Sequence, residues 1–215
     1  MKILFLTAAL LGLSCANHID PSLLRLEGRK DVEITGNEKL GTPSRISGEL
    51  ADLSGIKKNK RPEALIRFFS ENTFLFKLSD PEKELRLIRA EDDALGFTHF
   101  RFERVHGGVP VYLDELILHV NAKSSLYRFD GHYHPSFDLK AEPSVSAEKA
   151  GRIALDAAAE RRMERVDRTE LVFYPAPSGM RLAWHVTLGG GMNQWDYFID
   201  GLDGSVLFDQ DRRRF

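Results

Sequence analysis

Residues 96–120 read GFTHFRFERVHGGVPVYLDELILHV and give the clearest structural signal in the chain. Two runs of alternating apolar and polar residues flank a Gly-Gly turn. Successive side chains of a strand point to opposite faces, so this pattern predicts a hairpin with one buried and one solvated face. Phe100 and Phe102 belong to the buried face, and His99 and Arg101 to the polar one.

The pattern extends to both sides of this hairpin. Pro62 suits the first turn of a helix, and apolar residues follow it at helical spacing through Ser70. Alternation and turn residues then predict a run of strands, at about 84–90, 97–105, 109–120 and 125–130.

A second unit repeats the plan. Ser146 is the expected cap of an alanine-rich helix over 147–162, whose narrow apolar stripe would lie close against a sheet. Strands are expected after it, at 171–174, 181–188, 195–200 and 205–208. Each unit is thus a helix followed by an antiparallel sheet, which predicts an α+β fold.

These patterns predict five segments along the chain. They are a leader over 1–15, an N-terminal segment with short strands over 17–60, a first domain over 61–140, a second domain over 143–208 and a basic tail over 209–215. Trp184 and Phe100 are expected in the cores.

Composition and charge exclude some classes of function. The 215 residues are 42% hydrophobic and 29% charged, which is ordinary for one or two folded domains. The formal net charge is -2, and no basic stripe interleaves with aromatic residues. Nucleic acid is therefore not an expected partner.

The first residues, MKILFLTAALLGLSC, have the form of a targeting segment. Lys2 precedes an apolar run that is too short to anchor the chain across a bilayer. Two modes of processing stay open: lipidation of Cys15, although Gly12 replaces the usual branched residue, or cleavage after Ala16. Both predict an extracytoplasmic protein, either a membrane-anchored lipoprotein or a secreted or periplasmic one. With one cysteine, no disulfide forms within the chain.

The sequence lacks the common motifs for catalysis and cofactor binding. It has no His-Glu-x-x-His, no Gly-x-Ser-x-Gly, no phosphate loop and no dinucleotide fingerprint. His132 and His134 lie on one side of an extended segment, but no third ligand stands at a recognisable spacing. The acidic run 91–93 matches no calcium loop. We therefore predict a protein that is not an enzyme and has no metal or cofactor.

The hairpin strongly resembles the fungalysin/thermolysin propeptide (FTP) motif. The matching residues are 95–102, 108–111, 117–120 and Gly131. Before them, residues 46–50 are similar to the family's early strand, and residues 61–78 to its helix and the segment that follows the helix. Residues 143–208 resemble the PepSY domain that follows FTP in thermolysin-like precursors. The matching residues there are 146–150, 181–186, 197–200 and 204–207.

The resemblance implies two domains with cystatin-like packing, a helix on an antiparallel sheet. The printed chain ends at Phe215, whereas family precursors continue into a zinc peptidase domain. It thus resembles a free-standing propeptide that binds and inhibits, or helps to fold, a secreted thermolysin-like zinc metallopeptidase in trans. The alternative is an extracytoplasmic PepSY-type binding module or envelope lipoprotein with no peptidase target.

Arginine and aromatic residues are common anchors of protein interfaces. We therefore expect partner contacts on the wet sheet faces, although the aromatic residues among them also suit ordinary half-buried positions. The candidates are His99, Arg101, Tyr112, His119, Trp195 and Tyr197. The resemblance adds Phe215, whose terminal carboxylate would enter the peptidase cleft beside the zinc. Membrane contact is expected only through a lipid on Cys15.

Overall fold

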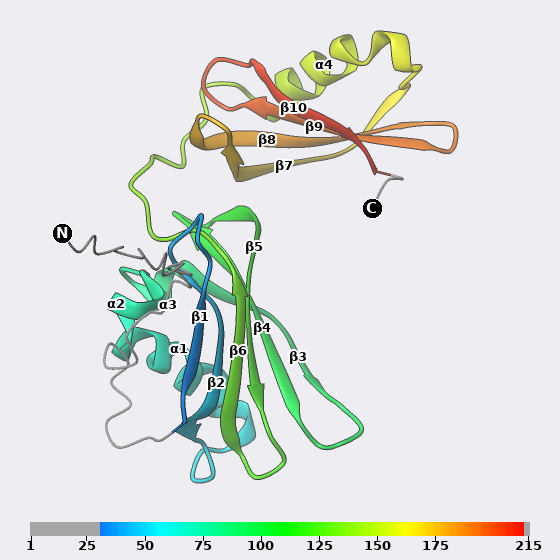
Figure 1. Cartoon of the computed structure of the whole chain (residues 1–215). Coiled ribbons are helices and arrows are strands. Elements are labelled where there is room, and N and C mark those ends of the chain that lie inside the picture. Colours follow the sequence, from blue (N-terminus) through cyan, green and yellow to red (C-terminus); the bar gives the residue numbers. More distant parts are fainter. Residues whose placement is uncertain (1–30, 213–215) are drawn as a thin grey trace, which may run out of the picture.

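The computed structural model describes residues 31–212, which form an α+β fold of two consecutive units (Figure 1). The first unit contains β1 (Glu33–Gly36), β2 (Pro43–Asp52), α1 (Arg61–Glu71), α2 (Thr73–Phe76), α3 (Pro81–Glu84), β3 (Leu85–Asp92), β4 (Thr98–His106), β5 (Val109–Val120) and β6 (Ser125–His132). The second contains α4 (Ala147–Ala157), β7 (Arg165–Ala176), β8 (Gly179–Gly190), β9 (Asn193–Asp200) and β10 (Val206–Asp211). The predicted fold class is confirmed.

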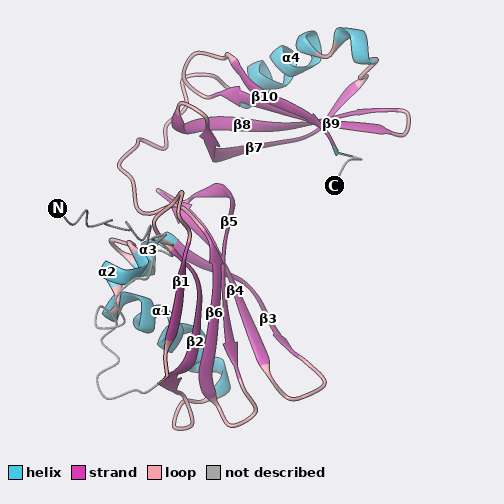
Figure 2. Ribbon diagram, viewed as in Figure 1, coloured by secondary structure: helices cyan, strands magenta, loops and turns pink. Residues whose placement is uncertain are grey.

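The first sheet has the order β1-β2-β6-β5-β4-β3, with every pair antiparallel. Its helices lie on one face of the sheet (Figure 2). Because β2 pairs with β6, residues 43–52 share this sheet and are not a separate segment. The predicted hairpin is β4 and β5, with Phe100 opposite Leu118.

Aromatic rings fill the layer between the helices and this sheet. Phe69 and Phe76, at the end of α1 and in α2, meet edge to face with ring centroids 4.7 Å apart. The rings of Phe102 and Phe129 lie 6.2 and 6.0 Å from that of Phe69. Such edge-to-face pairs contribute beyond the apolar area that they bury. The apolar face of the hairpin thus holds the helices in place.

In the second unit α4 packs on the antiparallel sheet β7-β8-β9-β10. The Ser146 hydroxyl caps the helix and accepts a hydrogen bond from the Lys149 amide at 3.2 Å. The helix ends at Ala157, earlier than expected, and a short 3₁₀ turn follows before Arg162 adopts a left-handed conformation. Ala150, Ala154 and Ala158 are buried against β8 and β9, as their size predicted, whereas Ala157, also expected in the stripe, is exposed.

Strand β5 joins the two units. Its first two residues, Val109 and Pro110, pair with β4, but residues 111–114 leave β4 at a bulge, and Val111 pairs in parallel with Phe173 of β7. Val111, Phe173 and Leu182 form a small core at this junction. The neighbouring Leu113 is 72% exposed and has a positive φ of 62°. A bulge that redirects a strand is a recurrent device near functional sites.

Candidate functional site

Three of the predicted contact residues lie together on the face of the first sheet that carries no helix. His99 and Arg101 project from β4, and His119 projects from β5. Arg101 forms an ion pair with Glu115 and stays 41% exposed. We call this surface the helix-free face of the first sheet.

His99 and His119 are directly opposite each other in the antiparallel register. Their Nδ1 atoms are 2.6 Å apart, within hydrogen-bonding distance. The outer ring nitrogens face carboxylates: His99 Nε2 is 3.3 Å from Asp93, and His119 Nε2 is 3.1 Å from Asp130. A continuous polar chain, Asp93–His99–His119–Asp130, therefore crosses three strands of the sheet and the turn before β4.

Two arginines stabilise the ionised form of Asp130, the carboxylate at the end of this polar chain. Arg45 Nε and Arg128 Nη2 each donate a hydrogen bond to Asp130 at 3.0 Å. Burial opposes the charged form, but the hydrogen bonds from Arg128 and Arg45 lower the pKa of Asp130. Burial is also the main cause that lowers the pKa of His119, against the attraction of Asp130. The carboxylate is thus ionised at neutral pH.

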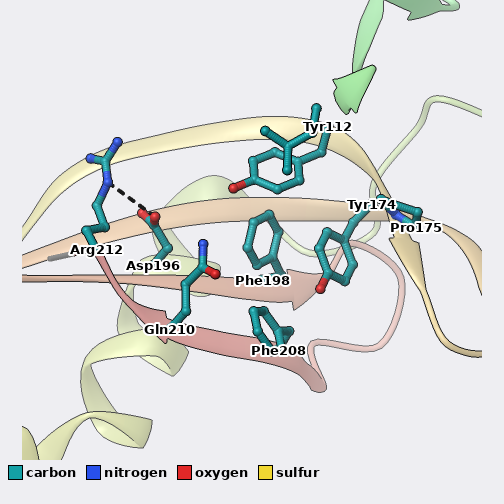
Figure 3. A pocket seen from close by; sticks show the side chains of 9 residues that line it. Tyr112, Tyr174, Pro175, Asp196, Phe198, Phe208, Gln210 and Arg212 are labelled. Atoms are coloured by element: carbon teal, nitrogen blue, oxygen red, sulfur yellow. Dashed lines mark ion pairs between the residues drawn. The ribbon is translucent and has the colours of Figure 1, made fainter. Parts of the chain in front are cut away.

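A second surface lies on the face of the second sheet opposite α4. Tyr197 and Ile199 of β9 pack under α4, so the alternate residues Asp196 and Phe198 point to the opposite face. A cavity of about 570 Å³ opens there (Figure 3). We call it the aromatic cavity; its lining is Tyr112, Leu113, Tyr174, Pro175, Asp196, Phe198, Phe208, Gln210 and Arg212.

Phe198 is the centre of the cavity wall. Its ring stacks on Tyr174, with centroids 4.2 Å apart, and on His185 at 4.7 Å. Tyr112 meets Phe198 edge to face at 4.7 Å. Burial, together with the Asp196 carboxylate, raises the pKa of Tyr112, although a hydrogen bond with Gln210 opposes the shift. Phe198, Tyr174 and Tyr112 carry no charge at physiological pH, because burial also raises the pKa of Tyr174, so this part of the cavity favours an apolar group.

The other end of the cavity is polar. The Thr187 hydroxyl donates a hydrogen bond to Asp196 at 2.9 Å, and His185 Nε2 lies 2.9 Å from the same carboxylate. Arg212 Nε forms an ion pair with Asp196 at 3.2 Å, drawn as a dashed line in Figure 3. Burial opposes ionisation, but hydrogen bonds from His185 and Thr187 lower the pKa of Asp196. The polar end thus contains the Asp196 carboxylate, which its hydrogen bonds hold in place and whose negative charge is largely balanced by its partners.

Two predicted contact residues have other roles. The expectation that Tyr197 lies on a wet face is wrong, because it is 1% exposed beneath α4. Its hydroxyl accepts a hydrogen bond from Arg161, whose guanidinium also lies 4.0 Å from the centroid of the half-buried Trp195 ring. Alternation alone could not tell which face of the second sheet receives the helix. Phe215 and Cys15 lie outside the described residues.

In the His132-Tyr133-His134 segment, His132 is exposed, whereas His134 contacts a buried carboxylate. His134 is held by the buried Asp114, whose carboxylate lies 2.8 Å from Nδ1 and accepts from the His134 amide at 2.7 Å. Tyr133 between the histidines is fully buried. Within residues 31–212, no group of three or more His, Cys, Asp or Glu side chains is arranged to hold a metal ion.

Sequence reasoning identified Tyr112 but missed the other walls of the cavity. Tyr174, Phe198 and Phe208 come from three strands that are not all adjacent in sequence. The available signal was the alternation of Asp196, Phe198 and Asp200, which marks a second, semi-polar face of β9. That signal does not reveal that Tyr112 of the first unit closes over this face.

The family model for the fungalysin/thermolysin propeptide motif matches residues 83–133, from α3 through β6. The chain carries this propeptide motif. The predicted resemblance, placed on the hairpin β4–β5, is confirmed.

The same relationship is seen in longer alignments. The chain is 35% identical to thermolysin of Alicyclobacillus acidocaldarius subsp. acidocaldarius over 192 residues, which are 83% of this chain and 34% of that protein. It is 31% identical to bacillolysin of Bacillus subtilis (strain 168) over 163 residues, 70% of this chain and 31% of that one. The chain thus spans about a third of the length of these curated relatives.

One solved structure similar to the chain is the C-terminal domain of Bacillus megaterium YpeB. It is 14% identical, with a TM-score of 0.39, and the match covers 88% of this chain and 92% of that domain. As for membrane spans, none of the helices between residues 31 and 212 has the length and apolar character to cross a bilayer.

Proposed function

We propose that this protein is a propeptide-like binding protein that docks on a secreted thermolysin-like zinc metallopeptidase in trans. Docking would inhibit the peptidase or assist its folding, and the chain itself would not be an enzyme. The observation that carries the proposal is the alignment of 83% of the chain with about a third of thermolysin, together with the propeptide motif at residues 83–133. In this proposal residues 143–208 are the PepSY-like partner of the motif.

The proposed mechanism is preferential binding to the folded peptidase. A protein that binds the native state and not the unfolded state stabilises the native state by mass action, by about 2.7 kcal/mol at 100-fold excess over Kd. A propeptide within one chain benefits from a high effective concentration, whereas a separate one needs a tighter surface. Lipidation of Cys15 would partly replace that advantage by holding the protein at the outer side of a membrane.

We place the docking contacts on the helix-free face of the first sheet and on the rim of the aromatic cavity. The first offers Arg101, which is paired and still 41% exposed, beside the His99–His119 pair. The second offers Tyr112 and the exposed Leu113 at the junction of the units. Exposed apolar groups around a well-formed cavity are typical of an interaction site.

A direct test is to mix the purified protein with thermolysin and bacillolysin and follow hydrolysis of a fluorogenic peptide. We expect saturable inhibition that develops slowly, together with faster recovery of activity when the denatured peptidase is refolded with the protein. A proteolytically inert surface protein of similar charge is the control. If neither inhibition nor refolding assistance appears with any secreted peptidase of this class, the proposal is wrong.

One observation favours a second candidate, a binding module without a peptidase target. Strand β10 is the last in the sheet order, and Phe208 and Gln210 on it line the aromatic cavity. An extended peptide could add to this edge and place alternate side chains in the cavity. Binding of short apolar peptides without inhibition of any thermolysin-like peptidase would favour this candidate.

A further inference from the structure

The hydrogen bonds along the polar chain Asp93–His99–His119–Asp130 require a particular number of hydrogens on the two imidazole rings. This number cannot be read from the sequence or from an alignment. We infer that His99 and His119 share one extra proton, so that the pair carries a single positive charge, and that acidification adds a second proton that separates the rings. The pair would then act as a pH-sensitive element on the helix-free face of the first sheet.

Counting protons on the four ring nitrogens gives this charge state. Each Nε2 faces a carboxylate, of Asp93 or Asp130, and such a contact is favourable only if the nitrogen carries a hydrogen. The Nδ1···Nδ1 contact at 2.6 Å needs one hydrogen between the two nitrogens. The arrangement therefore requires three N–H groups on two rings, and two imidazoles with three N–H groups carry one positive charge.

The other charge states each lose one of these contacts. Two neutral rings have only two N–H groups, so either one Nε2 lone pair would face a carboxylate or the two Nδ1 lone pairs would face each other. Two imidazolium rings have four N–H groups, so two N–H groups would point at each other across 2.6 Å. The state with one shared proton is thus the one that satisfies all three contacts.

Other charged groups near the pair are already engaged. They are Arg45 of β2 and Arg128 of β6 on Asp130, Glu91 of β3 opposite His99 and paired with Arg89, and Arg101 of β4 paired with Glu115 of β5. Tyr127 of β6 is a further titratable neighbour, whose ring lies 6.3 Å from that of His119. The two carboxylates that touch the rings are thus the groups that favour a positive charge there.

Solvent can stabilise a second positive charge on the histidine pair only weakly, because both side chains are largely buried. The side chain of His119 is only 17% exposed and that of His99 is 33% exposed. Burial, with a contribution from the neighbouring His99, lowers the pKa of His119, which agrees with a second proton that binds only in acid. Two coupled histidines then titrate in two macroscopic steps that belong to the pair.

The consequence for binding rests on the proposed function, because this face is one of the two proposed docking surfaces. A second proton would push the rings apart and change both the shape and the charge of the face. We therefore expect binding of the peptidase to weaken by at least about threefold between pH 7 and pH 5, a range in which histidine charge changes.

The decisive experiment needs no partner. Long-range ¹H–¹⁵N NMR spectra of the ¹⁵N-labelled full chain, recorded from pH 4 to pH 9, report which ring nitrogens carry hydrogen. We expect three protonated nitrogens on the pair at neutral pH, and two steps, each seen by both rings. Two independent single steps near the ordinary histidine value of about 6.5, with no effect of one ring on the other, would overturn the inference.

Matched variants separate this role from a merely structural one. Unfolding by urea should show greatest stability between the two steps, with loss on both the acid and the alkaline side. His99→Gln and His119→Gln should flatten this profile, whereas His132→Gln, at an exposed position on β6, should leave it unchanged. A flat wild-type profile would contradict the inference even if inhibition of a peptidase is found. Conversely, if stability is greatest between the two steps but the protein inhibits no peptidase, only the proposed function is contradicted.

Discussion

Tyr112 and Phe198 lie edge to face, with ring centroids 4.7 Å apart, although one belongs to the first sheet and the other to the second. The bulge in β5 makes this possible, because at residues 111–114 the strand leaves β4 and Val111 pairs with β7. The aromatic cavity is therefore a property of both units together. Changes at Tyr112 should affect the junction and partner binding at the same time.

Replacing Tyr112 with alanine removes one wall of the cavity. Aromatic pairs contribute about 0.5–1.5 kcal/mol beyond area burial, so we expect the free energy of unfolding to fall by about 1–3 kcal/mol. Inhibition of the peptidase should weaken at least tenfold. Tyr112→Phe keeps the ring and should retain most of both properties. Urea denaturation and inhibition assays on the two variants test this, and full potency of Tyr112→Ala would remove the residue from the interface.

Leu113 combines exposure with a left-handed backbone, which is strained for a leucine. We expect Leu113→Gly to raise the free energy of unfolding by about 0.5–1 kcal/mol, because relief of strain exceeds the entropy cost of glycine. Leu95 is similarly exposed, at 74%, but is not among the residues with positive φ, so Leu95→Gly should not stabilise the protein. Thermal unfolding of both variants checks the difference. Equal effects would mean that strain at Leu113 is negligible.

Arg104 is fully buried, and its Nη2 atom lies 2.8 Å from a Glu84 oxygen. Burial lowers the pKa of Arg104, against the attraction of Glu84 and Asp114. Removing one partner of a buried pair leaves an uncompensated charge, so Arg104→Ala should destabilise the protein by about 3–5 kcal/mol.

A neighbouring ion pair, which joins β3 to β4, is the control for Arg104. Arg86, 50% exposed, binds Glu103 at 2.6 Å, and Arg86→Ala should cost at most about 1 kcal/mol. Urea denaturation of both variants measures the contrast. Similar losses for the two arginines would show that burial of Arg104 does not determine its contribution.

Replacing Arg101 should weaken binding of the peptidase with little effect on stability. Its ion pair with Glu115 is exposed, so Arg101→Ala should change the free energy of unfolding by less than about 1 kcal/mol. If the helix-free face binds the peptidase, inhibition should weaken about tenfold, as for interface arginines. Arg168, which pairs with Glu170 at a similarly exposed place on β7, is the control and should retain full potency when changed to alanine. Unaltered inhibition by Arg101→Ala would rule out this contact.

The lowered pKa of Asp196 predicts how the free energy of unfolding depends on pH in the acid range. Its folded-state pKa lies below the usual value, despite the opposing effect of burial, because His185 and Thr187 stabilise the carboxylate. A lowered folded pKa gives stability that is present above the unfolded value of about 3.9 and lost as pH falls through the folded value. We expect Asp196→Asn to reduce the slope of stability against pH below about 4. Urea midpoints at pH 3, 4 and 7 give the test, and an unchanged slope would contradict it.

Some features were determined by the sequence alone, because they depend on local chemistry. Alternation of Phe100 and Phe102 with polar residues defines the buried face of β4, and Ser146 caps α4 as its side chain predicts. The FTP motif could be read from the same residues. Periodicity, capping and turn glycines act over a few residues, so the sequence contains them directly.

Other features exist only in the tertiary structure. The pairing of β2 with β6, the closure of Tyr112 over Phe198 and the position of Tyr197 beneath α4 join residues far apart in the chain. Alternation of apolar and polar residues shows that a strand has two different faces. Which of them the helix covers depends on the packing of the whole unit. The shared proton of His99 and His119 likewise depends on a cross-strand register, which is fixed by the combined packing of the sheet rather than by any local segment.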